Sequence, residues 1–137
     1  MSDEERTGTR NLDYSAWHRS ESIVRFLNDQ ATAKSLVMID LDAVECDLHM
    51  NPVALIETTQ QKSHKPVSMI RNLARMANLP AFLVHYETGK EKNPVNDKRL
   101  DIVGFRVRRV YPEPEPEPRP MTPKEFTELL VSLRRKP

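Results

Sequence analysis

Acidic side chains interrupt two apolar segments that lie on either side of His49. Each segment is predicted to be a β-strand, and the polar residues between them are predicted to form a short loop. If the chain folds back near His49, Glu57 faces the region of Asp40 and Asp42, because opposed residues of antiparallel strands lie roughly 4.5–5.5 Å apart. A carboxylate within an apolar strand is costly unless a metal ion, a hydrogen bond or a cation compensates it. Hard oxygen donors at this spacing suit Mg²⁺ or Mn²⁺, so the pattern predicts a divalent-metal site.

The spacing to Glu57 does not choose between Asp40 and Asp42. Both aspartates point to the same face of the strand, so both can approach a metal ion. Asp42 is favoured because its register pairs better with Glu57 across a short loop. The alternative interpretation is a solvated edge hairpin with exposed acids. Glu45 lies on the opposite face, where a salt bridge is expected.

The sequence gives little support for a zinc site or for a nucleophilic cysteine. Cys46 and His49 form a Cys-X-X-His pair, but a zinc site needs four well-placed ligands, and His64 and His85 are elsewhere in the chain. Cys46 is the only cysteine, so an internal disulfide is excluded. A nucleophilic thiol needs a partner base and a depressed pKa, and only His49 supports that role here.

The acidic segments belong to a predicted α/β (α+β) fold in which a small mixed sheet is flanked by helices. The helix between the second and third strands predicts a right-handed parallel crossover. Alternation places Val103, Phe105 and Val107 on one face of the last strand, with Arg106 and Arg108 on the other. The predicted elements are a helix at Tyr14–Asn28, strands at Leu36–Cys46 and Pro52–Thr58, a helix from Pro66 to near Asn78, a strand at Pro80–Tyr86, a flexible loop at Glu87–Asp101 and a strand at Ile102–Tyr111.

A segment rich in proline and glutamate, Pro112–Pro120, is predicted to be a stiff extended spacer of polyproline II type outside the core. A final helix follows, because Thr122 and Glu125 form a capping box and Pro123 takes the first helical position. The spacer would let this C-terminal helix dock a partner or a second subunit. The apolar stripe expected to make that contact consists of Phe126, Leu129, Leu130 and Leu133.

The composition sets broad limits on the class of protein. The 137 residues suffice for one compact domain, and the net charge of +1 neither demands nor excludes nucleic acid. Three glycines and the absence of a Walker or dinucleotide motif argue against phosphate loops. The N-terminus lacks the apolar core of a signal peptide, and no apolar run approaches the ~20 residues of a membrane span, so a soluble cytoplasmic protein without a membrane partner is expected. The predicted parts are a flexible N-terminus at 1–13, a domain at 14–111, the spacer at 112–120 and the helix at 121–137.

The order of the predicted elements, with carboxylates on the first two strands, resembles a minimal PD-(D/E)XK nuclease core of restriction-endonuclease-like fold. The longer run WHR…MIDLDAVEC…PVALIETT…K…LARMANLPAFLVHY resembles small phage and actinobacterial proteins of this superfamily over roughly residues 17–110. The resemblance implies a metal-dependent phosphodiesterase. A phage-encoded protein of this kind would act in the cytoplasm of its host cell.

The resemblance also implies roles for the acidic residues. In this superfamily an aspartate on one strand and a glutamate on the next hold Mg²⁺. Asp42 and Glu57 match these two carboxylates, with Asp40 as the competitor for the first place. A helix before the strands often adds a glutamate, and Glu21 is the only glutamate in the first predicted helix.

The lysine of the superfamily pattern is missing, since Glu57 is followed by two threonines where the pattern requires Glu-X-Lys. Thr59 can form a hydrogen bond to water but carries no positive charge. Two lysines are candidates for a displaced catalytic lysine. They are Lys62, in the connection after the strand, and Lys65, at the N-terminus of the next helix. Lys65 is preferred because superfamily members with a lysine moved to that helix are known.

Two groups of residues are candidates for contacts with nucleic acid. Trp17, His18 and Arg19 would stack on a base and contact phosphate, although the alternative is a core tryptophan beside a solvated face. Arg106 and Arg108 belong to a basic patch suited to the phosphate backbone. The alternative for this patch is an edge strand protected by charge.

The sequence therefore predicts a metal-dependent DNA endonuclease in which water attacks the phosphodiester with the help of Mg²⁺ or Mn²⁺. The rival hypothesis is a non-catalytic protein on the same fold that binds nucleic acid or a host protein, which the missing lysine favours. A third hypothesis is an interaction protein unrelated to nucleases. A homodimer is expected under the first hypothesis, because many nucleases of the superfamily dimerise.

Overall fold

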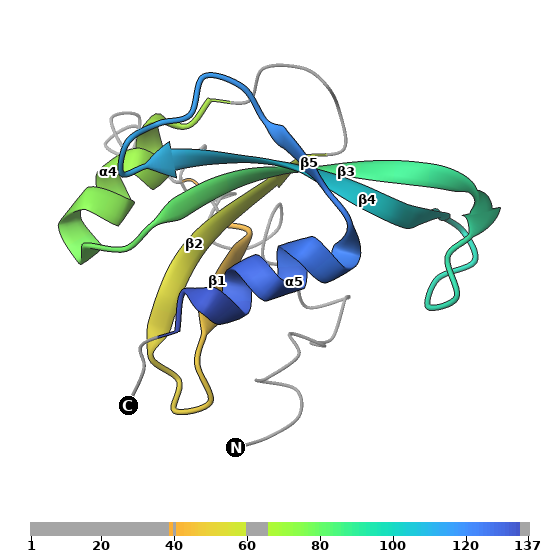
Figure 1. The fold of residues 1–137 in the computed structure, drawn as a ribbon, viewed down its shortest axis with the longest axis horizontal. Helices are drawn as coiled ribbons and strands as arrows, with labels where there is room; N and C mark the ends of the chain where they lie inside the picture. The colour runs from red at the N-terminus through yellow and green to blue at the C-terminus, as the bar shows by residue number, and fades with distance from the viewer. Residues whose placement is uncertain (1–38, 40, 60–65, 135–137) are drawn as a thin grey trace, which may run out of the picture. The chain divides into compact units, whose positions relative to one another are not determined.

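The computed structural model describes residues 39, 41–59 and 66–134, and these ranges contain one mixed five-stranded sheet and two helices (Figure 1). The strands follow the order β1-β2-β3-β4-β5 in the sheet. No helix in the described ranges is long and apolar enough to cross a lipid bilayer. The elements are β1 at Ala43–Cys46, β2 at Pro52–Thr59, α4 at Ser68–Ala77, β3 at Ala81–Lys92, β4 at Leu100–Tyr111, β5 at Arg119–Met121 and α5 at Pro123–Ser132.

The pairing of the strands confirms the predicted hairpin and the predicted parallel crossover. β1 and β2 are antiparallel, β2 and β3 are parallel and joined through α4, and β3 with β4 and β4 with β5 are antiparallel. The predicted first helix lies outside the described residues. Among the described residues of the predicted first strand, Ala43–Cys46 is paired, whereas Leu41 and Asp42 just before it are not in the strand.

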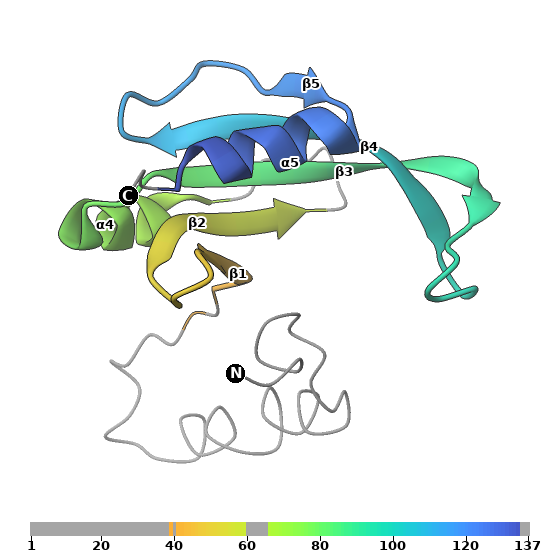
Figure 2. The same cartoon turned by 60° about the horizontal axis from the view of Figure 1, so that its bottom comes forward.

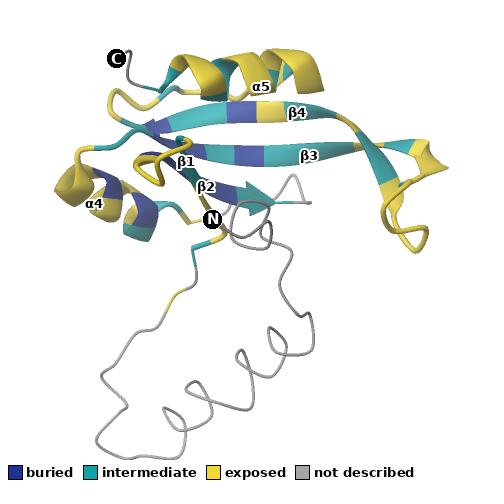
Figure 3. Cartoon of the chain, turned by 90° about the horizontal axis from the view of Figure 1, so that it is seen from below, coloured by how far each residue is buried: buried dark blue, intermediate teal, exposed yellow. Residues whose placement is uncertain are grey.

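Apolar residues on the two faces of the sheet form two clusters. One face carries the cluster covered by α5, and the other carries the cluster covered by α4, because neighbouring residues of a strand point to opposite faces. Figure 2 shows α5 lying along the strands, and Figure 3 shows the buried positions on the strands and on the inner side of α4. The buried members of the α5 cluster are Ala54, Ile56, Phe82, Val84 and Val107. Those of the α4 cluster are Leu55, Ile70, Ala74, Ala81 and Val110.

α4 ends where the sequence predicts, because Asn78 adopts a left-handed conformation (φ 57°) that continues no helix. The predicted start at Pro66 is wrong by two residues. Pro66 precedes the N-cap, Val67, and the first helical residue is Ser68. Val67 contributes no side-chain hydrogen bond to the cap but packs against the α4 cluster, so apolar packing rather than the proline fixes the start of the helix.

The predicted flexible loop at Glu87–Asp101 is wrong, because most of it is a β-hairpin. β3 continues to Lys92, β4 begins at Leu100, and only the residues between them are a loop. Asn93 orders that loop, since its Oδ1 accepts hydrogen bonds from the backbone N–H groups of Val95 (2.8 Å) and Asn96 (3.2 Å). This stretch is rich in polar residues because the outer part of the hairpin does not pack against the hydrophobic core, so both of its faces are largely exposed.

The segment after β4 is not an extended spacer. Glu115 bonds back to β4: its Oε1 accepts a hydrogen bond from the Arg109 N–H (2.8 Å), and its own N–H donates to the Arg109 carbonyl (2.9 Å). Arg119–Met121 then adds β5 beside β4. Proline is tolerated there because an edge strand needs no further donors on its outer side.

α5 packs on the sheet of its own chain. Its capping box is confirmed: Thr122 Oγ1 accepts from the Glu125 N–H and Glu125 Oε1 accepts from the Thr122 N–H, both at 3.1 Å. The apolar stripe expected to face a partner or second subunit contacts the α5 cluster instead. The residues that do so are Phe126, Leu129, Leu130 and Leu133.

Candidate functional site

Asp42 and Glu57 lie opposite each other, as predicted from the hairpin. Ala43 is paired with Ile56, which brings the residue before β1 level with Glu57. The Asp42 N–H donates to Glu57 Oε1 (3.1 Å). In return, Asp42 Oδ2 accepts from the N–H (2.8 Å) and the hydroxyl (3.1 Å) of Thr58. The two acids are thus tied together by backbone and side-chain hydrogen bonds.

Glu57 is the only charged side chain that is buried among the described residues, with 5 % of its surface exposed. Burying a carboxylate costs several kcal/mol unless charge or hydrogen bonds compensate it. The Asp42 N–H supplies part of that compensation. Asp42 itself is exposed, so the pair joins a buried acid to one that solvent reaches. The wholly exposed hairpin considered from the sequence is therefore excluded.

Asp42 and Glu57 are neighbouring carboxylates of the kind that binds divalent ions. In the part of the chain that the structure describes, no group of three or more histidine, cysteine or acidic residues is placed to hold a metal ion. Mg²⁺ is commonly held by one or two carboxylates while waters and substrate phosphates complete its shell, so Asp42 and Glu57 fit Mg²⁺ or Mn²⁺ in kind. They do not fit zinc, which requires a fuller protein shell.

Several candidate site residues lie outside the described residues, and the structure gives no position for them. Thr59, the neutral residue at the expected lysine position, is the last residue of β2. The candidates without a described position are Arg19, Glu21, Asp40, Lys62 and Lys65, together with Trp17 and His18.

Arg106 and Arg108 lie on the face of the sheet that bears α4. Val107 between them is buried in the α5 cluster, so the two arginines point the other way, as predicted. Arg106 pairs with Glu87 (Nε to Oε1, 2.7 Å), and both side chains are more than a third exposed, so the pair adds little stability. Arg108 lies opposite Leu83 and makes no ion pair with another described residue.

Cys46 is the last residue of β1 and His49 lies in the β1–β2 turn, and among the described residues neither belongs to a group placed to hold a metal ion. Asp47 organises this turn through its Oδ1, which accepts from the backbone N–H groups of His49 (2.8 Å) and Asn51 (3.0 Å). The backbone hydrogen bond from Asn51, followed by that from His49, lowers the pKa of the Asp47 carboxyl below its usual value. The turn fixes the register that brings Glu57 to Asp42.

Asp47→Ala is expected to lower the midpoint of thermal unfolding at neutral pH by a few degrees, because the turn loses its side-chain acceptor. A carboxyl with a depressed pKa stabilises the fold above its unfolded value of about 3.9 and loses this effect as the pH falls through the folded value. Circular dichroism melts should therefore show a difference from wild type that disappears in acid. Asp97→Ala is the control, because Asp97 is exposed and accepts no hydrogen bond from a described residue. An equal drop in both variants would contradict the role of Asp47.

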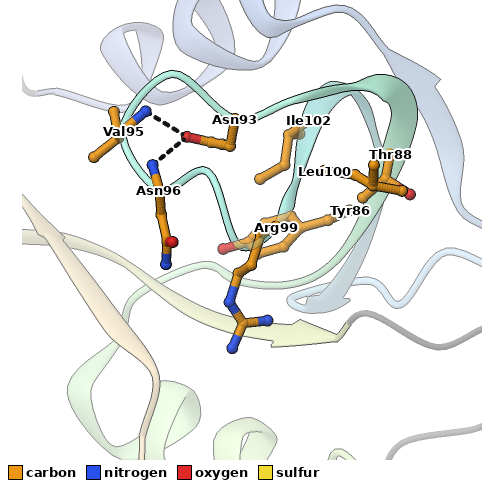
Figure 4. Close-up of a pocket in the computed structure, with 8 residues that line it drawn as sticks. All are labelled: Tyr86, Thr88, Asn93, Val95, Asn96, Arg99, Leu100 and Ile102. Carbon is orange, nitrogen blue, oxygen red and sulfur yellow. Dashed lines mark hydrogen bonds between the residues drawn. The ribbon is translucent and has the colours of Figure 1, made fainter.

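A separate hollow lies at the far end of the β3–β4 hairpin, and the sequence does not predict it, because this stretch has the polar composition of a loop. Its volume is about 550 Å³. Figure 4 shows Tyr86 and Arg99 among the side chains that line it. It contains none of the predicted site residues. The lining residues are Tyr86, Thr88, Asn93, Val95, Asn96, Arg99, Leu100 and Ile102.

Comparison with known proteins adds no relative to this picture. No protein-family model matches the chain, and no curated protein and no solved structure is significantly similar to it. A function for the protein must therefore be inferred from the arrangement of its own residues.

Proposed function

We propose that the protein is a metal-dependent phosphodiesterase that acts on DNA. The observation that carries the proposal is the pair of Asp42 and Glu57, tied together where β1 meets β2. A topology in which the acidic hairpin is followed by a helix and a parallel strand supports the resemblance to a restriction-endonuclease-like core.

The residues of the chain have distinct roles in this proposal. Asp42 and Glu57 hold Mg²⁺ or Mn²⁺, with Asp40 as a further carboxylate. The ion would activate water and offset negative charge on the phosphate. The Asp42 N–H fixes one Glu57 oxygen, and Thr58 fixes one Asp42 oxygen, so the two acids keep their orientation before substrate arrives.

Basic residues complete the proposed site. Lys65, with Lys62 as its competitor, positions the attacking water or offsets charge on the phosphate. Arg106 and Arg108 contact the DNA backbone, and they point to the same face of the sheet as Glu57. Arg19 and Glu21 are further candidates, for DNA and for the metal ion respectively.

A second candidate function is DNA binding without cleavage. Two observations favour it: the neutral Thr59 at the lysine position, and the hydrogen bonds that already compensate Asp42 and Glu57. The two functions differ in their dependence on metal, because a nuclease of this kind needs an ion for turnover and a binding protein does not.

The test is a cleavage assay on labelled single-stranded, duplex, nicked, flapped and branched DNA, with RNA for comparison. Each substrate is incubated with Mg²⁺, with Mn²⁺ and with EDTA. The proposal expects cleavage with either ion and none in EDTA. Folded protein that binds the substrates but leaves all of them intact in both ions would favour the second function.

A further inference from the structure

The face of the sheet that bears α4 is apolar at one end and polar at the other. α4 covers the apolar end, where Ile70 and Ala74 pack on Leu55 and Val110. Figure 1 shows α4 at the end of the sheet opposite the tip of the β3–β4 hairpin. From Leu83 toward that tip, the residues that alternation places on the same face of β2, β3 and β4 are polar or charged. They are Glu57, Thr59, His85, Glu87, Arg106 and Arg108.

The register orders these residues into two rows that cross the sheet. In the first row Glu57 is level with Leu83, and Leu83 is level with Arg108. Neighbouring strands are about 4.8 Å apart, so the backbones of Glu57 and Arg108 are about 10 Å apart across Leu83. A phosphate bound by the Arg108 guanidinium would therefore lie on the same face as the Glu57 carboxylate, without direct contact between the two anions.

The second row runs from Thr59 through His85 to Arg106. His85 is thus the cross-strand neighbour of the residue at the expected lysine position. Its Nδ1 is buried and has no hydrogen-bond partner among the residues that the structure describes. A buried polar atom without a partner is destabilising, and such an atom calls for a ligand or another specific explanation.

The basic side chains on this face differ in whether they already have an ion-pair or hydrogen-bond partner. The Arg106 guanidinium is held by Glu87 at 2.7 Å. Arg108 makes no ion pair and His85 Nδ1 no hydrogen bond within the described ranges. An imidazole N–H and a guanidinium fork are both suited to the oxygens of a phosphodiester. The unused donors therefore lie on the face toward which Glu57 points.

We propose that a phosphate of the DNA backbone binds on this face beside Glu57, held by Arg108 and by His85, whose imidazole turns on binding so that its buried Nδ1 reaches the phosphate. This inference rests on the proposed function, because it takes DNA as the ligand of the site. His85 is a phosphate-binding residue in this arrangement, and its cross-strand neighbour Arg106 is paired with Glu87. The neutral Thr59 is tolerated because His85 and Arg108 supply donors to the phosphate.

The experiment measures binding separately from cleavage. A fluorescent duplex of 20 base pairs and its single strand are titrated with protein in Ca²⁺ by anisotropy, and the same variants are assayed for cleavage in Mn²⁺. His85→Ala and Arg108→Ala are each expected to weaken binding about 10-fold, the effect of one lost charge-assisted contact. Arg108→Ala should also lower the salt dependence of binding by about one ion.

Two further variants control for a structural role. His85→Asn keeps a donor near the position of Nδ1 and is expected to restore most of the binding lost in His85→Ala. Lys90→Ala removes an exposed charge from the same hairpin and should bind as wild type. If His85→Ala does not fold, as judged by its thermal melt, the Arg108→Ala and His85→Asn variants decide the question.

The outcomes separate this inference from the proposed function. Weaker binding in the His85 and Arg108 variants supports the inference even if the wild-type protein cuts no substrate, a result that would overturn only the nuclease. Unchanged binding in both variants overturns the inference, while cleavage by the wild type would leave the nuclease standing. A wild-type protein that neither binds nor cuts DNA overturns both.

Discussion

Glu57→Gln is expected to lose metal-dependent cleavage by about 10³-fold or more, the scale of loss when a group that stabilises charge in a transition state is removed. Glu57 is the buried member of the acidic pair, with 5 % of its surface exposed, and the next residues of β2, Thr58 and Thr59, carry no carboxylate that could replace it. An amide oxygen is a much weaker ligand for Mg²⁺ than a carboxylate oxygen. Cleavage in Mg²⁺ and in Mn²⁺, measured on the best substrate, gives the size of the loss.

The same variant is expected to fold normally. Glutamine has nearly the shape of glutamate, and its Oε1 can still accept from the Asp42 N–H, which donates at 3.1 Å in the wild type. Removing a buried charge also removes its desolvation cost. Glu91→Gln, at an exposed position on the hairpin arm, controls for the loss of one negative charge. Cleavage by Glu57→Gln at the wild-type rate would show that the acidic pair is not the metal site.

Phe126→Ala is expected to lower the free energy of unfolding by about 2–3 kcal/mol. The phenyl ring packs on the α5 cluster and lies 4.8 Å from the ring of Phe105, measured between centroids. Truncating a phenylalanine in a core costs about 3–5 kcal/mol, and the lower figure is expected here because this side chain is only half-buried. Urea denaturation followed by circular dichroism measures the difference.

Val131→Ala is the matched control, since Val131 is on the same helix and 52 % exposed. A change of less than about 0.5 kcal/mol is expected for it, as for most surface substitutions. If both variants unfolded like the wild type, α5 would not be part of the folded unit in solution. The helix would then be available to a partner, as the sequence alone suggested.

The sequence by itself determined the features that depend on neighbouring residues. The alternation in two strands and the short turn between them placed Glu57 opposite Asp42. Caps are equally local, and for that reason the start of α5 at Thr122 and the end of α4 at Asn78 were predicted correctly.

Tertiary structure alone decided the features that depend on distant residues. The polar hairpin arm resembles a loop in the sequence, because strands without a buried face carry no apolar alternation. The proline- and glutamate-rich segment resembles a free spacer, because its bonds to Arg109 and the pairing of β5 with β4 join separate parts of the chain. The row from Thr59 to His85 and Arg106 is set by the register of three strands. No local pattern encodes that register, since it follows from how α4 and α5 pack against opposite faces of the sheet.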